Sequence, residues 1–181
     1  METLVFDTSP LAHFARAGWL GVLKALVGSH RAVIPVQVVA ELRKAAGHEP
    51  AIAAMLEENW IERHELTSVA ELRSFAGFAA NLMGAGRNEG ETAVLAVAAT
   101  MPATAVIDDS AAYKAAQRAG VSCIRTLALL CKAVHQGLLT TMLVSEIADD
   151  LIATEYRLPF GPGEFVTWAV AEDLFPLSDL P

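Results

Sequence analysis

Carboxylates follow two short apolar runs of the chain. The run 3–6 (TLVF) is followed by Asp7, and the run 105–107 (AVI) is followed by Asp108 and Asp109. Each run is predicted to be a short buried strand. Open α/β sheets bind their ligands beyond the carboxyl ends of their strands. The two runs therefore predict acids at the edge where such a sheet does its chemistry.

Helix capping is the simpler explanation for several acids. Asp109, or the serine after it, would cap the helix that follows, because both residue types favour that position. Asn88 and Glu91 have the spacing of a capping box at the start of an apolar helix. Glu41 lies at the rim of its predicted helix, where a glutamate is ordinarily solvated. Each acid therefore has a structural alternative when it is considered alone.

The same acids are also expected to lie close together. Asp7, Glu91, Asp108 and Asp109 are all expected at helix starts along one sheet edge, with Glu41 one helix away. Adjacent parallel strands lie about 5 Å apart, so these carboxylates can converge. Carboxylates that share a cleft either raise one another's pKa or hold a hard cation. Because the sequence shows no histidine or cysteine cluster, oxygen ligands favour Mg²⁺ or Mn²⁺, as in phosphoryl-transfer hydrolysis.

Strands and helices alternate along the first 137 residues. Strands are predicted at 3–6, 31–34, 60–66, 105–107 and 121–124, and helices at 9–28, 35–46, 50–58, 68–83, 92–99, 111–119 and 127–135. The connections are too long for hairpins, so the fold class is α/β, with a mainly parallel central sheet covered by helices on both faces as a three-layer sandwich.

Beyond residue 137 the pattern predicts helices alone. One amphipathic helix is expected over 140–155, and a last one carries large apolar side chains such as Phe165 and Trp168. We therefore expect a catalytic domain over 1–137 and a C-terminal helical extension over 138–181 that packs on the same domain.

Composition limits the function classes. The chain has 181 residues, 54% of them apolar, and a formal net charge of -8. This charge argues against a protein that holds nucleic acid through a large basic surface, but acids around a cation site are compatible with an enzyme that acts on nucleic acid. Cys123 and Cys131 are expected to be free thiols in a reduced compartment. The N-terminus lacks signal-peptide features and no membrane span is predicted, so a cytoplasmic protein is expected.

Other acid-dependent chemistries fit the sequence less well. A haloacid-dehalogenase-type phosphatase needs a second aspartate two residues after its nucleophile, where this chain has Ser9. A phosphoacceptor receiver domain needs paired acids after its first strand, and only Asp7 is present there. A Walker loop is absent, and the glycine-containing segment 84–90 follows a helix with the wrong spacing for dinucleotide binding.

Four motifs in order resemble those of PIN-domain proteins, metal-dependent ribonucleases that include the VapC-type toxins of bacterial toxin–antitoxin pairs. The motifs are 5–11 (VFDTSPL), 34–42 (IPVQVVAEL), 90–96 (GETAVLA) and 106–109 (VIDD). The chain is similar to a VapC-like branch with Gly-Glu at the third motif, and the segment 156–158 (YRL) also resembles that branch. The resemblance covers residues 3 to about 136.

The resemblance implies a set of site residues. Asp7, Glu41, Glu91 and Asp108 would form the acidic metal site, with Asp109 as an alternative or additional member. We choose Glu91 over Glu89, because only one of the two can face the cleft from a helix.

Further roles are implied less directly. Thr8 and Ser9 would orient Asp7 by hydrogen bonding. Relatives often carry arginine soon after the paired acids, whereas this chain has Tyr113 and Lys114 there, so Lys114 is only a weak candidate for a contact to the substrate phosphate.

The resemblance also implies the activity and partners. The expected function is hydrolysis of RNA phosphodiester bonds with Mg²⁺ or Mn²⁺, by a homodimer that pairs with a cognate antitoxin. Two alternatives remain at this point. One is an inactive PIN-like module that binds RNA or protein, and the other is a small-molecule phosphohydrolase on a related sheet.

Overall fold

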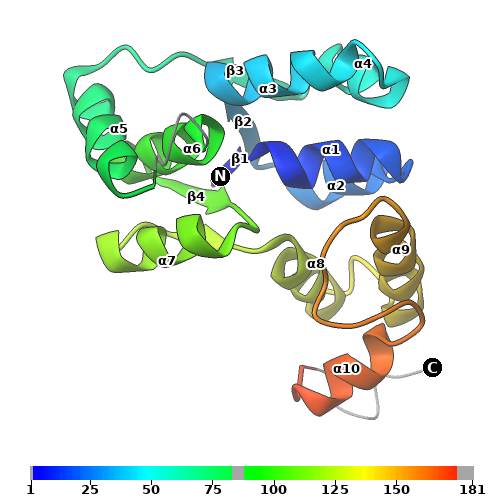
Figure 1. The fold of residues 1–181 in the computed structure, drawn as a ribbon. Coiled ribbons are helices and arrows are strands. Elements are labelled where there is room, and N and C mark those ends of the chain that lie inside the picture. Colours follow the sequence, from blue (N-terminus) through cyan, green and yellow to red (C-terminus); the bar gives the residue numbers. More distant parts are fainter. Residues whose placement is uncertain (1, 83–87, 175–181) are drawn as a thin grey trace.

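The described part of the chain is built around one parallel sheet. A computed structural model describes residues 2–82 and 88–174, and within these ranges the sheet has five strands in the order β3-β2-β1-β4-β5 (Figure 1). The strands are β1 (Thr3–Phe6), β2 (Arg31–Pro35), β3 (Ile61–His64), β4 (Ala103–Val106) and β5 (Cys123–Ile124). Every neighbouring pair is parallel. The five predicted strands are all present.

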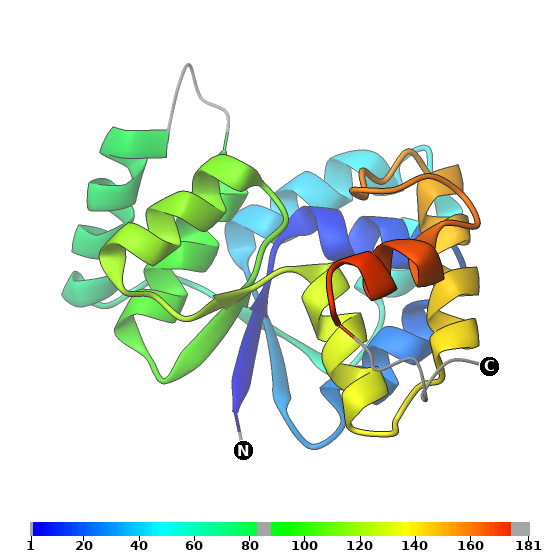
Figure 2. The ribbon, with the colours of Figure 1, turned by 90° about the horizontal axis from the view of Figure 1, so that it is seen from below.

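Helices cover both faces of the sheet. They are α1 (Thr8–Arg16), α2 (Leu20–Val27), α3 (Val36–Ala46), α4 (Pro50–Leu56), α5 (Val69–Leu82), α6 (Glu89–Thr100), α7 (Ser110–Ala119), α8 (Thr126–His135), α9 (Thr141–Ala153) and α10 (Phe165–Ala171). Helices α5, α6 and α7 lie on one side, and the others lie on the opposite side (Figures 1 and 2). The predicted α/β sandwich is confirmed. In the described ranges, no helix has the length and apolar character needed to cross a membrane.

The core lies between the sheet and these helix layers. Strand β1 is completely buried, with Val5 and Phe6 at 0% exposure. Helix α6 is buried along most of its length because it packs across the centre of the sheet. Ile147 of α9 and Phe165 of α10 are fully buried in the same core cluster. The C-terminal helices thus contribute to the core that carries the sheet.

The order in which strands are added to the sheet reverses between β1 and β4. From β1 the chain continues to β2 and β3 on one side, whereas β4 continues to β5 on the other. Phe6 pairs with Val106, and the backbone N–H of Asp7 donates to the carbonyl oxygen of Val106 at 3.1 Å. Such a switch point leaves a crevice at the carboxyl ends of the strands. Asp7 and Asp108 both follow strands that end there.

Three helix starts differ from the sequence prediction. Helix α1 begins at Thr8, not at Ser9, and tolerates Pro10 because first-turn N–H groups have no partner within a helix. The capping box expected from Asn88 and Glu91 is not formed: Asn88 adopts a φ of 72° and makes no side-chain cap. Helix α8 begins at Thr126, one residue before its predicted start.

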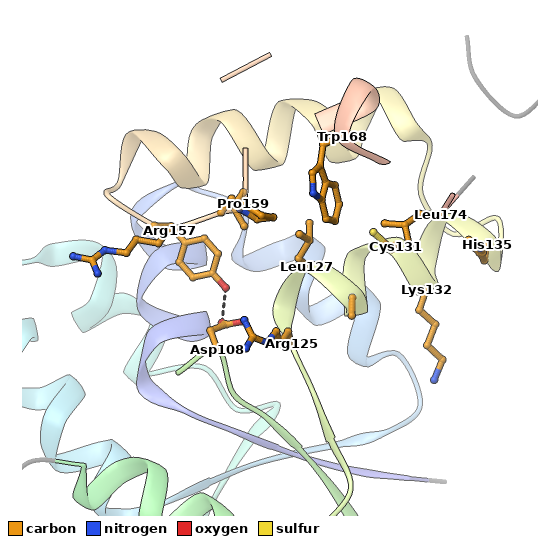
Figure 3. A pocket seen from close by; sticks show the side chains of 13 residues that line it. Asp108, Arg125, Leu127, Cys131, Lys132, His135, Arg157, Pro159, Trp168 and Leu174 are labelled. Atoms are coloured by element: carbon orange, nitrogen blue, oxygen red, sulfur yellow. Dashed lines mark hydrogen bonds between the residues drawn. The ribbon is translucent and has the colours of Figure 1, made fainter. Parts of the chain in front are cut away.

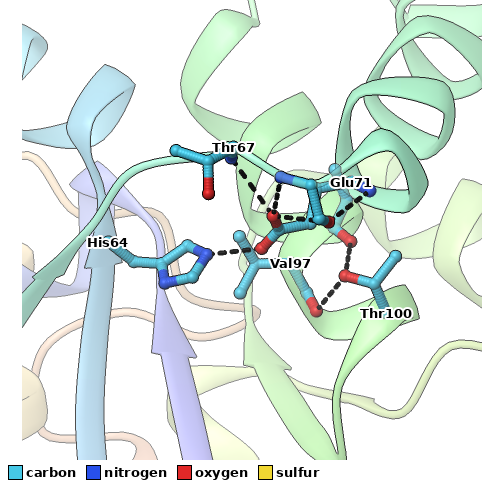
Figure 4. Close-up of polar contacts among 7 residues, drawn as sticks. His64, Thr67, Glu71, Val97 and Thr100 are labelled. Carbon is cyan, nitrogen blue, oxygen red and sulfur yellow. Dashed lines mark hydrogen bonds and ion pairs between the residues drawn. The ribbon is translucent and has the colours of Figure 1, made fainter.

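Helix α5 has a charged capping network at its start (Figure 4). The Glu71 carboxylate accepts hydrogen bonds from the backbone N–H and the hydroxyl of Ser68 at 2.9 and 2.8 Å, and it contacts Nε2 of His64 at 2.5 Å. The backbone N–H of Glu71 donates in return to the Ser68 hydroxyl at 3.1 Å. Burial raises the pKa of Glu71, but these hydrogen bonds outweigh it and lower the pKa to about 2.

We expect Glu71→Gln to lower the free energy of unfolding by about 1–2 kcal/mol, because it removes a charge-assisted cap. The ordinary pKa of 4.5 exceeds that of the folded state, so this stabilisation is complete above about pH 4.5 and is lost as the pH falls toward 2. Denaturant unfolding at pH 7 and pH 3 measures both effects. Exposed Glu65 provides the control, Glu65→Gln, and an equal loss at both pH values for Glu71→Gln would contradict the assignment.

Candidate active site

Asp7 is the buried acid at the centre of the sheet edge. Its residue exposure is 3%, and its Oδ1 accepts no hydrogen bond. Burial raises the pKa of Asp7 well above its ordinary value, and the charges of Glu91, Glu41 and Asp108 raise it further, against the lowering effect of the Thr8 backbone N–H. A carboxylate in this environment gains from a nearby cation.

Glu41 projects from α3 onto the first turn of α6. Its Oε1 accepts the backbone N–H of Gly90 at 3.1 Å, and its Oε2 accepts the hydroxyl of Thr8. A Cβ atom at position 90 would lie 2.7 and 2.9 Å from the two carboxylate oxygens, so only glycine leaves room for this approach. Thr8, expected to orient Asp7, directs its hydroxyl to Glu41 instead. Oδ1 of Asp7 accepts no hydrogen bond from the Ser9 hydroxyl.

Asp108 is held by two segments that follow it in the chain. The backbone N–H of Thr126 donates to Oδ1 at 2.9 Å and its hydroxyl donates to Oδ2 at 2.7 Å. The phenol of Tyr156 also donates to Oδ2 (Figure 3). Tyr156 is buried, and both this burial and the Asp108 charge raise the pKa of the phenol, so it remains a donor. From the sequence, Thr126 has no predicted role in the site, and Tyr156 belongs only to the short segment 156–158 of the resemblance.

The other two acids differ in their surroundings. Asp109 is exposed and caps α7, accepting the backbone N–H groups of Ala111 and Ala112 at 2.9 and 2.8 Å. Glu91 lies in the first turn of α6, and burial together with the charges of Glu41 and Asp109 raises its pKa. Glu89, two residues earlier, is exposed. The sheet edge thus gathers Asp7, Glu41, Glu91 and Asp108, and Asp109 acts on Glu91 from its rim.

Sequence comparison decides the family. A family model described as a PIN domain matches residues 3–161. The chain belongs to the PIN-domain family. No curated protein matches it. Among solved structures, the fold is similar to that of a chain in the VapBC2 complex from Rickettsia felis bound to a DNA fragment from its promoter, with 13% identity and a TM-score of 0.50 over 68% of this chain and 98% of the other.

The family implies a divalent cation, and the donor chemistry of this PIN domain is suited to one. Among the described residues, no group of three histidine, cysteine or acidic side chains is arranged to hold a metal ion. Mg²⁺, however, commonly binds through one or two carboxylates and completes its shell with water and substrate phosphate. Asp7, with an unpartnered Oδ1, and Glu91, whose charge raises the pKa of Asp7, fit such a site.

Lys114 lies in a hollow between α5 and α7. The hollow has a volume of about 390 Å³ and is also lined by Asn81, Ser110 and Arg118. None of the five candidate acids lines this hollow. A contact between Lys114 and the substrate phosphate therefore stays a prediction from the resemblance.

We expect Tyr156→Phe to lower kcat about 10- to 100-fold, because loss of a partner that orients a metal-site carboxylate typically has this effect. The free energy of unfolding should fall by only about 1 kcal/mol, since the ring stays and Thr126 still holds Asp108. Steady-state RNA cleavage and thermal unfolding measure the two effects. The control is Trp19→Phe, which removes an aromatic hydrogen-bond donor to Asp150 outside the acidic site. Equal kcat for both variants would contradict a role for the phenol.

Proposed function

We propose that this PIN domain is a ribonuclease that hydrolyses RNA phosphodiester bonds with Mg²⁺ or Mn²⁺. The observation that carries the proposal is the buried Asp7 carboxyl group, which has an unpartnered Oδ1 and three neighbouring carboxylates at the switch point of the sheet. Burying such a group without compensation is costly, so the arrangement calls for a cation. Family membership supports the same conclusion.

The side chains would divide the work between binding and orientation. Asp7 and Glu91 would hold the cation, and Glu41 and Asp108 would complete the acidic metal site around it. Glu41 is held by hydrogen bonds from Gly90 and Thr8. Asp108 is held in the same way by Thr126 and Tyr156. These carboxylates would therefore need little reorganisation when the cation binds. When bound, Mg²⁺ or Mn²⁺ supplies an activated water and offsets charge on the phosphate oxygens.

Cleavage of structured RNA by the purified chain tests the activity. We expect products with Mn²⁺ or Mg²⁺, none in EDTA, and none from Asp7→Asn with either metal. Glu89→Gln is the matched control and should cleave normally, because Glu89 is exposed. Turnover of p-nitrophenyl phosphate with no cleavage of RNA would instead support a small-molecule phosphohydrolase.

A non-catalytic binding module is the second candidate. It is favoured by the hydrogen bonds of Asp109 to α7 and of Asp108 to Thr126, which also explain these acids as structural anchors. Isothermal titration with Mn²⁺ separates the two functions. Absence of both Mn²⁺ binding and RNA cleavage in a folded protein would support the binding module.

The proposed biological setting is a cytoplasmic toxin–antitoxin pair in which the chain is a homodimer. The support is the fold shared with a chain of a VapBC2 complex. Coexpression with the product of a short neighbouring reading frame should yield a stable complex in which RNA cleavage is suppressed. Light scattering of the isolated chain measures the dimer. A monomeric chain whose cleavage is unaffected by that product would argue against this setting.

A further inference from the structure

A second functional surface begins at Asp108. The residue lies between the acidic site and a pocket of about 830 Å³ formed by α8, α10 and the segment that leaves α9 (Figure 3). Pockets of this size accommodate small organic groups. A substrate whose phosphate lies at the acids would therefore have this pocket directly beside it.

The centre of the pocket is apolar and includes one aromatic wall. Leu127 and Cys131 of α8 face Trp168 of α10 (Figure 3). The Trp168 ring lies 5.0 Å from that of Phe160 and 6.3 Å from that of Phe165, centroid to centroid. It is only partly buried. A fixed and partly exposed indole next to aliphatic side chains is a suitable surface for a planar ring.

Cations lie at the edges of the same pocket. Arg125 is close to Asp108, while Arg157 and Lys132 extend away from the apolar centre on opposite sides (Figure 3). Arg125 is positioned by Tyr113, whose ring centroid lies 4.7 Å from the guanidinium carbon, and by a 3.3 Å hydrogen bond to the Ser110 hydroxyl. Arg125, Arg157 and Lys132 are all exposed, although the chain as a whole carries a formal net charge of -8.

We propose that this pocket binds an unpaired nucleobase of the RNA substrate, next to the phosphodiester bond that is cleaved. The inference rests on the proposed ribonuclease function. The base would stack on Trp168, and backbone phosphates on either side would contact the edge cations Arg125, Arg157 and Lys132. A protein segment could also fill an apolar pocket, but edge cations next to the catalytic acids fit a nucleotide chain better.

Binding measured without cleavage tests the pocket. The probe is a fluorescently labelled single-stranded octanucleotide of RNA, compared with versions that carry one abasic nucleotide at each position in turn. Anisotropy in EDTA reports affinity for the wild-type chain. We expect one abasic position to weaken binding about 10-fold, because the RNA then loses the base that stacks on Trp168.

Variants of the pocket residues test whether the sensitivity to an abasic position arises at this pocket. Trp168→Ala should weaken binding of the intact RNA about 10-fold and remove the sensitivity to the abasic position, whereas Trp168→Phe should keep both. Arg157 and Lys132 are exposed, so replacing either with alanine should leave the core intact. Arg157→Ala and Lys132→Ala should each reduce the salt dependence of RNA binding by the amount expected for one released counterion. Trp19→Phe is the control for loss of an indole elsewhere.

The outcomes separate this inference from the proposed activity. Equal affinity at every abasic position, or unchanged binding by a folded Trp168→Ala variant, would overturn the base pocket and favour an apolar segment of a protein partner. If Trp168→Ala does not fold, unchanged salt dependence in Arg157→Ala and Lys132→Ala would overturn it as well. Base-dependent binding without cleavage in Mn²⁺ would retain the pocket and refute the ribonuclease.

Discussion

Asp7→Asn is expected to abolish RNA cleavage and at the same time to stabilise the metal-free protein. Asparagine keeps the shape of the side chain but removes a charge that is buried and repelled by Glu91, Glu41 and Asp108. We expect cleavage to fall by at least on the order of 10³-fold, below the level at which products are detected. The free energy of unfolding should rise by about 1 kcal/mol, which for a domain of this size corresponds to about 2–4 °C in melting temperature.

The gain in stability should depend on pH. The folded-state pKa of Asp7 lies above the ordinary value of 3.8, so both folded and unfolded chains carry the proton below that value. As the pH rises, the unfolded chain releases its proton first, and the wild type loses stability until the pH passes the folded-state pKa. The difference between Asp7→Asn and wild type should therefore be small at pH 3 and largest at neutral pH.

Divalent cations should make the wild type more stable than Asp7→Asn, which is the reverse of the order expected in EDTA. Mn²⁺ at concentrations well above its dissociation constant stabilises the folded wild type by mass action. It should raise the melting temperature of the wild type and of the control Glu89→Gln, but not that of Asp7→Asn. A lower melting temperature for Asp7→Asn than for wild type in EDTA would show that the carboxyl group is a structural anchor. That result would remove the main argument for the nuclease.

The position of the acids at the sheet edge could be predicted because it depends on local sequence patterns. A buried strand that ends in an acid is visible in the residues 3–7 and again in 105–108, and the β1–β4 pairing brings the two acids to neighbouring positions. Short strands that lack clear alternation are harder to delimit. The strand predicted over 121–124 comprises only Cys123–Ile124, and the one predicted over 60–66 comprises Ile61–His64.

The partners of the acids were not predictable, since they come from distant parts of the chain. Tyr156, which donates to Asp108, directly follows Glu155, and Glu155 adopts a φ of 67° after the end of α9. A non-glycine residue in that conformation leaves no clear sequence signal. Asp109 shows the opposite case: residue type predicted that Asp109 or the serine after it caps α7, and in the structure Asp109 is the cap.

Gly90→Ala is expected to act through Glu41. The added methyl group would lie under 3 Å from both carboxylate oxygens, so the Glu41 side chain must move and lose its hydrogen bond from the Gly90 N–H. We expect cleavage to fall about 10- to 100-fold, as for other groups that orient a metal-site ligand. The cost in the free energy of unfolding should be about 1 kcal/mol, because the end of a flexible side chain can yield.

A double-mutant cycle with Glu41→Ala isolates this contact. The three atoms nearest to the new methyl group all belong to Glu41, so that background removes these close contacts. Alanine is also favoured over glycine in a helix by up to about 1 kcal/mol. Gly90→Ala should therefore change sign, from destabilising in the wild type to neutral or stabilising in Glu41→Ala, and it should cost no further activity. Equal effects in the two backgrounds, measured by denaturant unfolding and RNA cleavage, would show that Gly90 is required for a reason other than the approach of Glu41.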